Sequence, residues 1–340
     1  MNAVKKISLL FLAAALIAGQ CACSWRGRVI REDLSGGETA TDAAPQIISP
    51  SDGTAGQSYE STVSLYFPYS EDSLLGREER TIFYSANDRL ENAVLNALLA
   101  GPREDYPQLN PIVNEKTQIV NTSLSGNCLF ITFNSAFLDP VSEMPENWTD
   151  DAELLATVRA QRRLAVLSIV NSVTAVPGVR QVQILVDTGD DGLGRRIRRQ
   201  DVGLSPTGDN VDELLEAISR QYASNASLQT VSSLVFRLMQ DKNADRLYTY
   251  IADGYNDEKP TYAQWIDAFR SVEWTLESYE VMESVPGYDG ESANVFVNAK
   301  FNISLGGTQE YMGGTLHFVC QSGVWKVEYD SLRAILPSAQ

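Results

Sequence analysis

The residues richest in chemical groups follow a strand-like segment and combine aspartates, glycines and arginines. Four of them resemble the start of a calcium-binding loop: Asp187, Asp190, Asp191 and Gly192. Such a loop needs an acidic or amide residue at its third position and a glutamate at its twelfth. Gly189 and Arg198 stand at those two places. The pattern therefore favours a solvated Asp/Gly turn over a metal site.

The densest basic patch of the chain comes directly after this turn: Arg195, Arg196, Arg198 and Arg199. These arginines could bind an acidic partner or a polymer of the cell wall. Because aspartates precede them so closely, the pattern favours ion pairs within the segment over a binding surface.

The chain has one histidine, His317, which lies between Leu316 and Phe318 in a strand-like segment. With one histidine, the chain cannot build a Cys/His metal cluster, and no histidine-based catalytic triad is indicated. No glycine-rich phosphate loop follows a strand. The sequence therefore predicts no catalytic residues, no metal and no cofactor, and it favours a structural or surface role for His317.

The first residues have the organisation of a bacterial lipoprotein signal. A basic start precedes an apolar run at residues 7–18, which is too short to span a bilayer. Cys23 follows Ala22, the small residue expected before an acylated cysteine, whereas Cys21 follows Gln20. We expect lipidation at Cys23, with Cys21 as the alternative, and removal of residues 1–22. The alternative is an ordinary secretory signal, and either signal takes the mature chain out of the cytoplasm.

Composition limits the partners of the exported chain. Hydrophobic residues make up 44% and charged residues 21% of 340 residues, which is typical of a globular protein with two domains. A net charge of −17 argues against nucleic acid and against adsorption to anionic lipid headgroups. We therefore expect the lipid chain alone to hold the protein at the membrane. Cys128 and Cys320 are interpreted as small core residues on strands.

Residues 23–60 are predicted to form a disordered tether, because their small and polar residues bury too little apolar surface to offset the entropy of ordering. A first domain is expected at 61–204. Its predicted elements are, in chain order, strands at 63–67 and 81–84, a helix capped by Asp88 and ended by Gly101 and Pro102, strands at 118–124 and 128–133, a helix from Thr149 or Asp150 to about Ala175, and a strand at 182–186. Residues 161–163 interrupt the apolar pattern of the long helix and are expected to face solvent.

The motifs of this domain, in this order and spacing, resemble the GerM domain of bacterial sporulation and spore-germination lipoproteins. They are Glu79-Arg80-Thr81, Leu98-Leu-Ala-Gly-Pro102, Phe133-Asn-Ser-Ala-Phe137, Val170-Asn-Ser172 and Pro177-Gly-Val179. The resemblance implies a compact α/β domain, similar to the ring-building motif of secretion-type assemblies. It implies a role in scaffolding or oligomer assembly and carries no catalytic residues. The segment at 187–199 departs from the family pattern.

A second unit is expected after a linker helix at 205–225, which would use Val211, Leu214, Leu215 and Ile218 as its apolar face. Three helices and then four strands follow, near 274–285, 293–304, 311–320 and 324–330. Helices before an antiparallel sheet that ends in Gly323-Val-Trp-Lys-Val327 resemble the NTF2-like, or cystatin-like, fold. The resemblance implies a cone at 226–340, and its tryptophans are interpreted as core filling.

The fold expected for the chain is therefore α+β, a GerM domain followed by an NTF2-like cone. The favoured function is that of a non-enzymatic, membrane-anchored envelope lipoprotein with an assembly domain, in sporulation or germination. Its partners would be other proteins or further copies of itself, with contact to the cell wall as an additional option. The alternative is a lipoprotein that captures a small molecule or a wall fragment in the C-terminal cone. A more distant reading is a cone-shaped hydrolase or isomerase.

Overall fold

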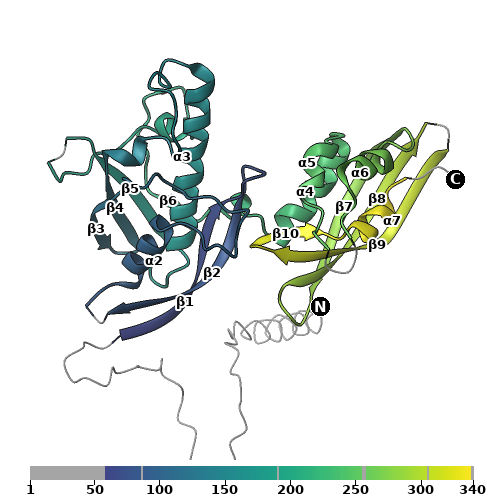
Figure 1. The fold of residues 1–340 in the computed structure, drawn as a ribbon, viewed down its shortest axis with the longest axis horizontal. Coiled ribbons are helices and arrows are strands. Elements are labelled where there is room, and N and C mark those ends of the chain that lie inside the picture. The colour runs from purple at the N-terminus through teal and green to yellow at the C-terminus, as the bar shows by residue number, and fades with distance from the viewer. Residues whose placement is uncertain (1–57, 86, 190, 255–257, 305, 338–340) are drawn as a thin grey trace, which may run out of the picture. The chain divides into compact units, whose positions relative to one another are not determined.

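The computed structural model describes residues 58–337, apart from 86, 190, 255–257 and 305. This part of the chain is α+β, as the sequence predicts, with one two-stranded ribbon and two four-stranded sheets (Figure 1). Cys21, Cys23 and nearly all of the expected tether lie outside the described residues. Between residues 58 and 337, no described helix is long and apolar enough to cross a membrane.

The first half of the described chain contains the ribbon, one mixed sheet and two α-helices. The elements are β1 (Ser58–Pro68), β2 (Leu75–Ser85), α2 (Leu90–Leu99), β3 (Ile119–Ser125), β4 (Cys128–Asn134), α3 (Ala152–Val173), β5 (Gln181–Asp187) and β6 (Ile218–Ser219). β1 and β2 form the ribbon, and the sheet order is β3-β4-β5-β6. β4 and β5 are parallel, while the other neighbours are antiparallel.

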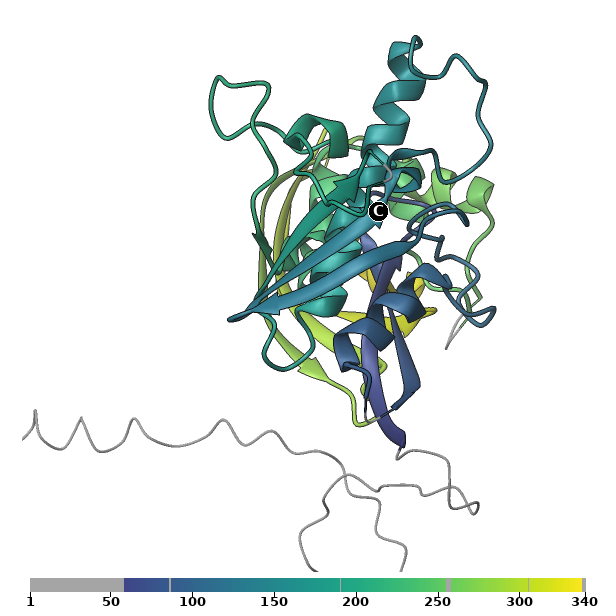
Figure 2. The same ribbon diagram turned by 90° about the vertical axis from the view of Figure 1, so that its left-hand side faces the viewer.

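The hairpin of β3 and β4 forms as predicted, with Gly126 in the left-handed region at φ 61°. Alternation places Leu129, Ile131 and Phe133 on one face of β4, and all three are fully buried. Cys128 on the opposite face is half-buried and has a free thiol. α3 packs against β1, β5 and α2, so the core of this half surrounds the long helix (Figure 2).

Both expected helix starts differ from the structure by one residue. Asp151, rather than Thr149 or Asp150, caps α3 and accepts hydrogen bonds from the backbone N–H groups of Glu153 and Leu154. Arg89 occupies the cap position of α2, and the carboxylate of Asp88 accepts from the Arg89 N–H and from the side-chain amide of Asn92. The end of α2 is as predicted, because Gly101 is left-handed at φ 82°.

The linker helix expected at 205–225 is wrong. Only Leu215 of its proposed apolar face is fully buried, while Val211 and Leu214 are 61% and 44% exposed. The Leu215 N–H donates to the Ile197 carbonyl at 2.8 Å, and the Leu215 carbonyl accepts from the side chain of Gln183. Both polar backbone groups of Leu215 are thus hydrogen-bonded in an extended conformation, and no helix is needed to pair them.

The second half of the described chain has three helices, then an antiparallel sheet, then a short helix. The elements are α4 (Leu228–Gln240), α5 (Ala244–Tyr248), α6 (Tyr262–Phe269), β7 (Trp274–Pro286), β8 (Ser292–Ile303), β9 (Gly307–Gln321), β10 (Val324–Val327) and α7 (Tyr329–Ile335). We call residues 226–337 the C-terminal region. Its four strands match the prediction, except that β10 ends at Val327 and α7 follows. The further likeness to an NTF2-like cone stays a prediction.

Aromatic rings fill the space between the helices and the sheet of the C-terminal region. Trp265, Phe269, Trp274 and Phe301 form a continuous chain of ring contacts, with centroids 5.1–5.5 Å apart. Trp265 and Phe301 are fully buried, and Trp274 is 3% exposed. The interpretation of Trp265 and Trp274 as core filling is therefore confirmed. Trp325 is half-buried.

β7 is an edge strand of its sheet, which runs in the order β10-β9-β8-β7. Its pairing with β8 is interrupted by two register shifts, after Leu276 and after Val281. Three glutamates of β7 are exposed: Glu277, Glu280 and Glu283. The outer edge of this strand is therefore irregular and acidic.

Residues of the β1–β2 loop contact the helices and the last hairpin of the C-terminal region. The Asp72 carboxylate, whose side chain is 4% exposed, accepts two hydrogen bonds from Arg246 at 2.6 and 2.9 Å and one from the Tyr250 hydroxyl at 2.6 Å. The Arg77 N–H donates to the Gly323 carbonyl at 2.8 Å. Gly323 is left-handed at φ 79°, and a Cβ there would lie 2.2 Å from the Arg77 carbonyl oxygen.

Candidate functional site

The motif residues of the first half join separate backbone segments through buried polar groups. Glu78, which directly precedes the Glu-Arg-Thr motif and is fully buried, accepts from Arg80 Nε at 2.6 Å and from the Arg103 N–H at 3.1 Å, and it forms an ion pair with Arg103 Nε at 2.9 Å. Arg80 also donates to the carbonyls of Ala97 and Gly101, at the end of α2. The Glu-Arg-Thr motif and the Gly-Pro motif are therefore two sides of one contact.

The Val-Asn-Ser motif has the same kind of role on α3. The Asn171 amide donates to the Gln221 carbonyl, to Ser224 Oγ and to Asn225 Oδ1, and its oxygen accepts from the Gln221 N–H at 2.8 Å. Ser172 Oγ accepts from the Tyr66 N–H at 2.9 Å. This motif fixes β1 and the segment at 221–225 against the helix. The partners of Asn171 lie beyond the expected domain boundary at 204, and that boundary stays a prediction.

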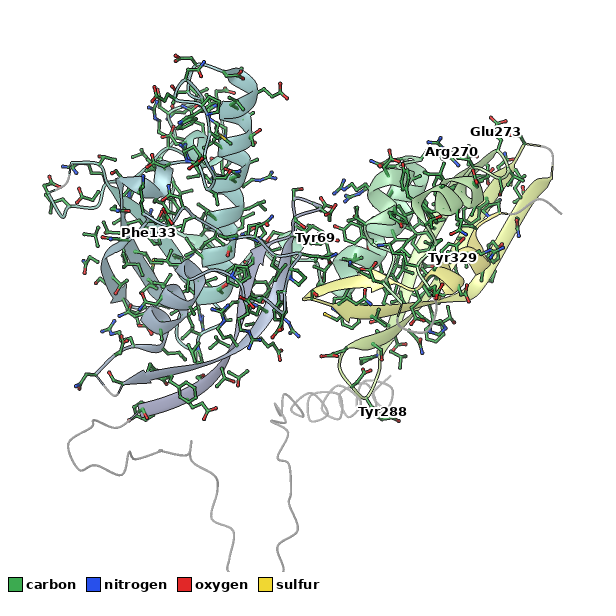
Figure 3. The ribbon with its side chains drawn as sticks, in the orientation of Figure 1. Tyr69, Phe133, Arg270, Glu273, Tyr288 and Tyr329 are labelled. Atoms are coloured by element: carbon green, nitrogen blue, oxygen red, sulfur yellow. The ribbon has the colours of Figure 1, made fainter. Side chains whose placement is uncertain are left out.

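The Phe-Asn-Ser-Ala-Phe motif closes the carboxyl end of β4. Phe133, labelled in Figure 3, stacks on Phe137 with their centroids 4.7 Å apart and 8° between ring planes. The side chain of Asn134 donates to the Lys116 carbonyl and accepts from the Gln118 N–H. Arg80, Phe133, Asn134, Asn171 and Ser172 of these motifs therefore make contacts that hold the fold together.

A hollow of about 680 Å³ lies beside Leu99 and Gly101 of these motifs, and we call it the acidic hollow. Its apolar lining comes from Leu99, Val113, Pro140, Met144 and Trp148. Four carboxylates lie around it: Glu115, Asp139, Glu143 and Glu146. None of the four forms an ion pair with a described residue, and Lys116 is the one cation of the lining. The hollow therefore presents a negative potential around an apolar floor.

Two side chains position the loop that forms one wall of the acidic hollow. Asn114 donates to the carbonyls of Ala136 and Pro140, both at 3.3 Å. Arg162 on α3 donates to the Leu138 and Asp201 carbonyls, and its guanidinium lies 5.5 Å from the centre of the Trp148 ring. Burial lowers the pKa of Arg162 below its ordinary value.

The expectation that residues 161–163 face solvent is wrong. All three are half-buried, and a Cβ at Gly203 would lie 3.4 Å from the Cβ of Arg163. The reason is that arginine can pack its stem on apolar surface while its head satisfies backbone carbonyls. An interruption of an apolar pattern by arginine is therefore compatible with a covered helix face.

The Asp/Gly turn after β5 forms by internal hydrogen bonds. The Asp187 carboxylate accepts from the N–H groups of Gly189, Asp191 and Gly192. Arg195 donates to Asp191 at 2.6 and 3.1 Å, and these bonds lower the pKa of Asp191 to about 2. Asp190 lies outside the described residues. In the described chain no group of three or more metal-ligating side chains comes together.

The arginines of this segment form ion pairs, as the sequence favours, but only Arg195 pairs with the preceding aspartates. Arg196 pairs with Glu216 at 2.8 Å, and Arg198 pairs with Asp212 at 2.8 Å. Arg199 lies 3.9 Å from Glu213, whose pKa is lowered chiefly by a hydrogen bond from the Thr207 hydroxyl. The patch is therefore neutralised within its own segment.

His317 and Cys320 are both on β9. The side chain of His317 is exposed, on the face opposite the buried Leu316 and Phe318, and its Nδ1 lies 2.5 Å from Asn294 Oδ1. Cys320 is free and half-buried, and burial raises the pKa of its thiol. His317 is thus a surface residue, in agreement with the sequence, and does not reach the interior of the C-terminal region.

The comparison with family models agrees with the resemblance that the motifs carry. Residues 64–189 match the model of the family described as "Germane: Sporulation and spore germination". We call the matched segment, residues 64–189, the Germane domain after this model. The match ends two residues after β5, so the arginine segment and the C-terminal region lie outside it. Among curated proteins no match was found.

Solved structures similar to the chain include domains of the sporulation protein GerM from Bacillus subtilis. Its tandem GerMN domains are 20% identical over 52% of this chain and 50% of that chain, with a TM-score of 0.32. The first GerMN domain alone is 10% identical over 38% of this chain and 84% of that chain, with a TM-score of 0.23. This chain therefore spans about half the length of the tandem-domain structure.

The acidic hollow of the Germane domain was not predicted from the sequence. The loop at 139–148 carries three of its carboxylates together with Met144 and Trp148. Two prolines in ten residues and a high density of acids were the available signal. That signal could not show that Glu115 and Leu99, which are distant in sequence, lie around the same hollow.

Proposed function

We propose that the protein is a non-enzymatic envelope lipoprotein, held on the membrane by acylated Cys23, whose Germane domain assembles with other proteins or further copies during sporulation or germination. The observation that carries the proposal is the family match at residues 64–189. The use of the motif residues as buried fold contacts supports a binding module rather than an enzyme.

The acidic hollow indicates what chemistry a partner would bring. Carboxylates without ion pairs around an apolar floor suit lysine or arginine side chains, whose stems are apolar and whose heads are cationic. A partner with a basic segment would place its stems against Met144 and Trp148 and its charges beside the carboxylates.

The role of the hollow is tested in the source bacterium by reversing two charges. Glu143→Lys with Glu146→Lys should lower the yield of heat-resistant spores, or their germination, as far as deletion of the gene does. The control is Glu104→Lys with Asp105→Lys, which changes two exposed acids outside the hollow by the same charge. Immunoblots must show equal amounts of each variant. Normal sporulation and germination in the deletion strain would refute the proposed process.

The anchor is tested separately by membrane fractionation. Cys23→Ser should release the protein into the soluble fraction, whereas Cys21→Ser should leave it on the membrane. Release by the Cys21 change alone would move the lipidation site to Cys21. If neither change releases the protein, the lipoprotein assignment fails.

A further inference from the structure

A second hollow, of about 850 Å³, lies between α4 and the edge strand β7. α4 contributes Thr230, Ser233 and Arg237 to its lining, and β7 contributes Tyr279 and Ser284. Tyr222, which precedes α4, also lines it. We call it the tyrosine groove. Its volume is in the range of pockets that bind small ligands.

The charge of the tyrosine groove is opposite to that of the chain. Its charged lining residues are Arg237 and Arg246, and no aspartate or glutamate lines it, although the chain carries a net charge of −17. Asp72 neutralises Arg246. The side chain of Arg237 forms no ion pair or hydrogen bond with a described residue, so its guanidinium is available to a ligand.

Two tyrosine rings give the groove flat apolar surfaces. Tyr222 is 71% exposed, and Arg220 lies over its ring at 5.2 Å from the centroid. Tyr279 stacks on Phe236 with centroids 5.1 Å apart and 14° between planes, which fixes the orientation of its ring. A ligand with flat, partly apolar rings would find two fixed surfaces here.

We propose that the tyrosine groove binds a carboxylate-bearing sugar chain of the cell wall. Arg237 provides paired N–H donors that match the geometry of a carboxylate. The hydroxyls of Ser233 and Ser284 can exchange hydrogen bonds with sugar hydroxyls, and the tyrosine rings accept the apolar faces of sugar rings. A polyol phosphate would satisfy Arg237 but has no ring to place on the tyrosines. The inference rests on the proposed extracytoplasmic location, which gives the groove access to the wall.

Calorimetric titration of the full chain, purified in detergent, tests the groove without reference to the anchor. The probe is the disaccharide of N-acetylglucosamine and N-acetylmuramic acid, which carries one carboxylate. The neutral comparison is diacetylchitobiose, which has similar rings and no carboxylate. We expect the disaccharide to bind at least about tenfold more tightly than chitobiose, as the loss of one charge-assisted hydrogen-bonded pair implies.

Matched variants locate the binding. Arg237→Gln should weaken disaccharide binding at least about tenfold and leave chitobiose binding unchanged, since only the carboxylate contact is lost. Tyr222→Ala should weaken the binding of both sugars. The controls Arg270→Gln and Tyr288→Ala make the same chemical changes at exposed positions of the C-terminal region outside the groove (Figure 3). Neither control should change the affinity for either sugar. Circular dichroism must show that each variant is folded.

Four outcomes would overturn the inference. They are no binding of the disaccharide, equal affinity for chitobiose, disaccharide affinity unchanged by Arg237→Gln, or tighter binding of poly(glycerol phosphate) than of the disaccharide. If Tyr222→Ala fails to fold, the disaccharide affinity of Arg237→Gln alone decides whether the groove is the binding site. Failure here leaves the membrane-release and sporulation tests unaffected, so the two proposals can fail independently.

Discussion

In the Germane domain, buried charged and amide side chains join the motif segments to one another and to their neighbours, whereas in the C-terminal region aromatic rings fill much of the interior. Glu78 and Asn171 each join backbone segments that are distant in sequence. Trp265 and Phe301 instead fill volume and make a small number of directed contacts. A polar contact works only with a particular residue in a particular place, while a ring can be replaced by another apolar group of similar volume.

This difference explains why one half of the chain has recognisable motifs. The Glu-Arg-Thr, Gly-Pro and Val-Asn-Ser segments are the visible trace of hydrogen-bonded contacts between α2, α3 and their neighbours. The C-terminal region shows alternation, turn residues and the short ending Gly323-Val-Trp-Lys-Val327, a pattern that is less specific than the ordered motifs of the first half. If the comparison is right, polar substitutions in the Germane domain should cost more stability than conservative changes of rings.

The largest effect is expected for Glu78→Ala. Removal of the buried carboxylate leaves Arg80 and Arg103 without their counter-charge, which should lower the free energy of unfolding by about 3–5 kcal/mol. Urea unfolding of the wild type and the variant measures the difference. The control Glu79→Ala removes an exposed partner of Arg77 and should cost at most about 1 kcal/mol. Similar losses for the two variants would contradict the assignment of Glu78 as a central contact.

The next largest effect is expected for Asn171→Leu, which keeps the approximate volume and removes every hydrogen bond of the amide. Unpaired groups at Gln221 and Asn225 should then cost about 2–4 kcal/mol in unfolding free energy. Asn121→Leu, at an exposed position on β3, is the matched control and should change stability by less than about 0.5 kcal/mol. A loss below about 1 kcal/mol for Asn171→Leu would mean that this contact is dispensable.

A smaller effect is expected for Trp265→Phe in the C-terminal region. The ring contact with Phe269 is largely kept, while the hydrogen bond from Trp265 Nε1 to the Ala244 carbonyl, at 2.8 Å, is lost. We expect a cost of about 1–2 kcal/mol, measured by the same urea titration. If this conservative change costs more than Asn171→Leu, the proposed contrast between the two halves is wrong.

The smallest effect is expected for His317→Gln. The side chain is exposed, and glutamine retains an amide that can bond to Asn294, so the unfolding free energy should fall by at most about 1 kcal/mol. Sporulation or germination should be normal with this variant. Loss of either in a folded variant would restore the enzymatic reading of the C-terminal region.

Local patterns predicted most of the elements and few of the long-range contacts. The β3–β4 hairpin follows from alternation about Gly126, and the four C-terminal strands follow from alternation and turn residues. The helix expected at 205–225 failed because backbone pairing of Leu215 with Ile197 outweighed a weak apolar period. Pairing with the aspartates of the turn was foreseen and is found for Arg195, whereas Arg196, Arg198 and Arg199 pair with acids at 212–216 that the pattern did not indicate.

The two hollows could not be predicted because each brings together residues that are far apart in sequence. Leu99, Glu115 and Trp148 meet only after the ribbon, α2 and the loop at 139–148 have packed. Tyr222 and Tyr279 meet through the packing of α4 on β7. A single sequence shows the charge of each side chain but not which charges will share a surface.

The irregular, acidic edge of β7 has a consequence for how copies of the protein meet at high local concentration. Crowded sheets with straight, unpaired edges tend to join strand to strand and aggregate. Two breaks in register and three exposed glutamates make such joining unfavourable, since neighbouring copies would bring like charges together without a continuous hydrogen-bond ladder. The C-terminal region is thereby protected against polymerisation through this strand.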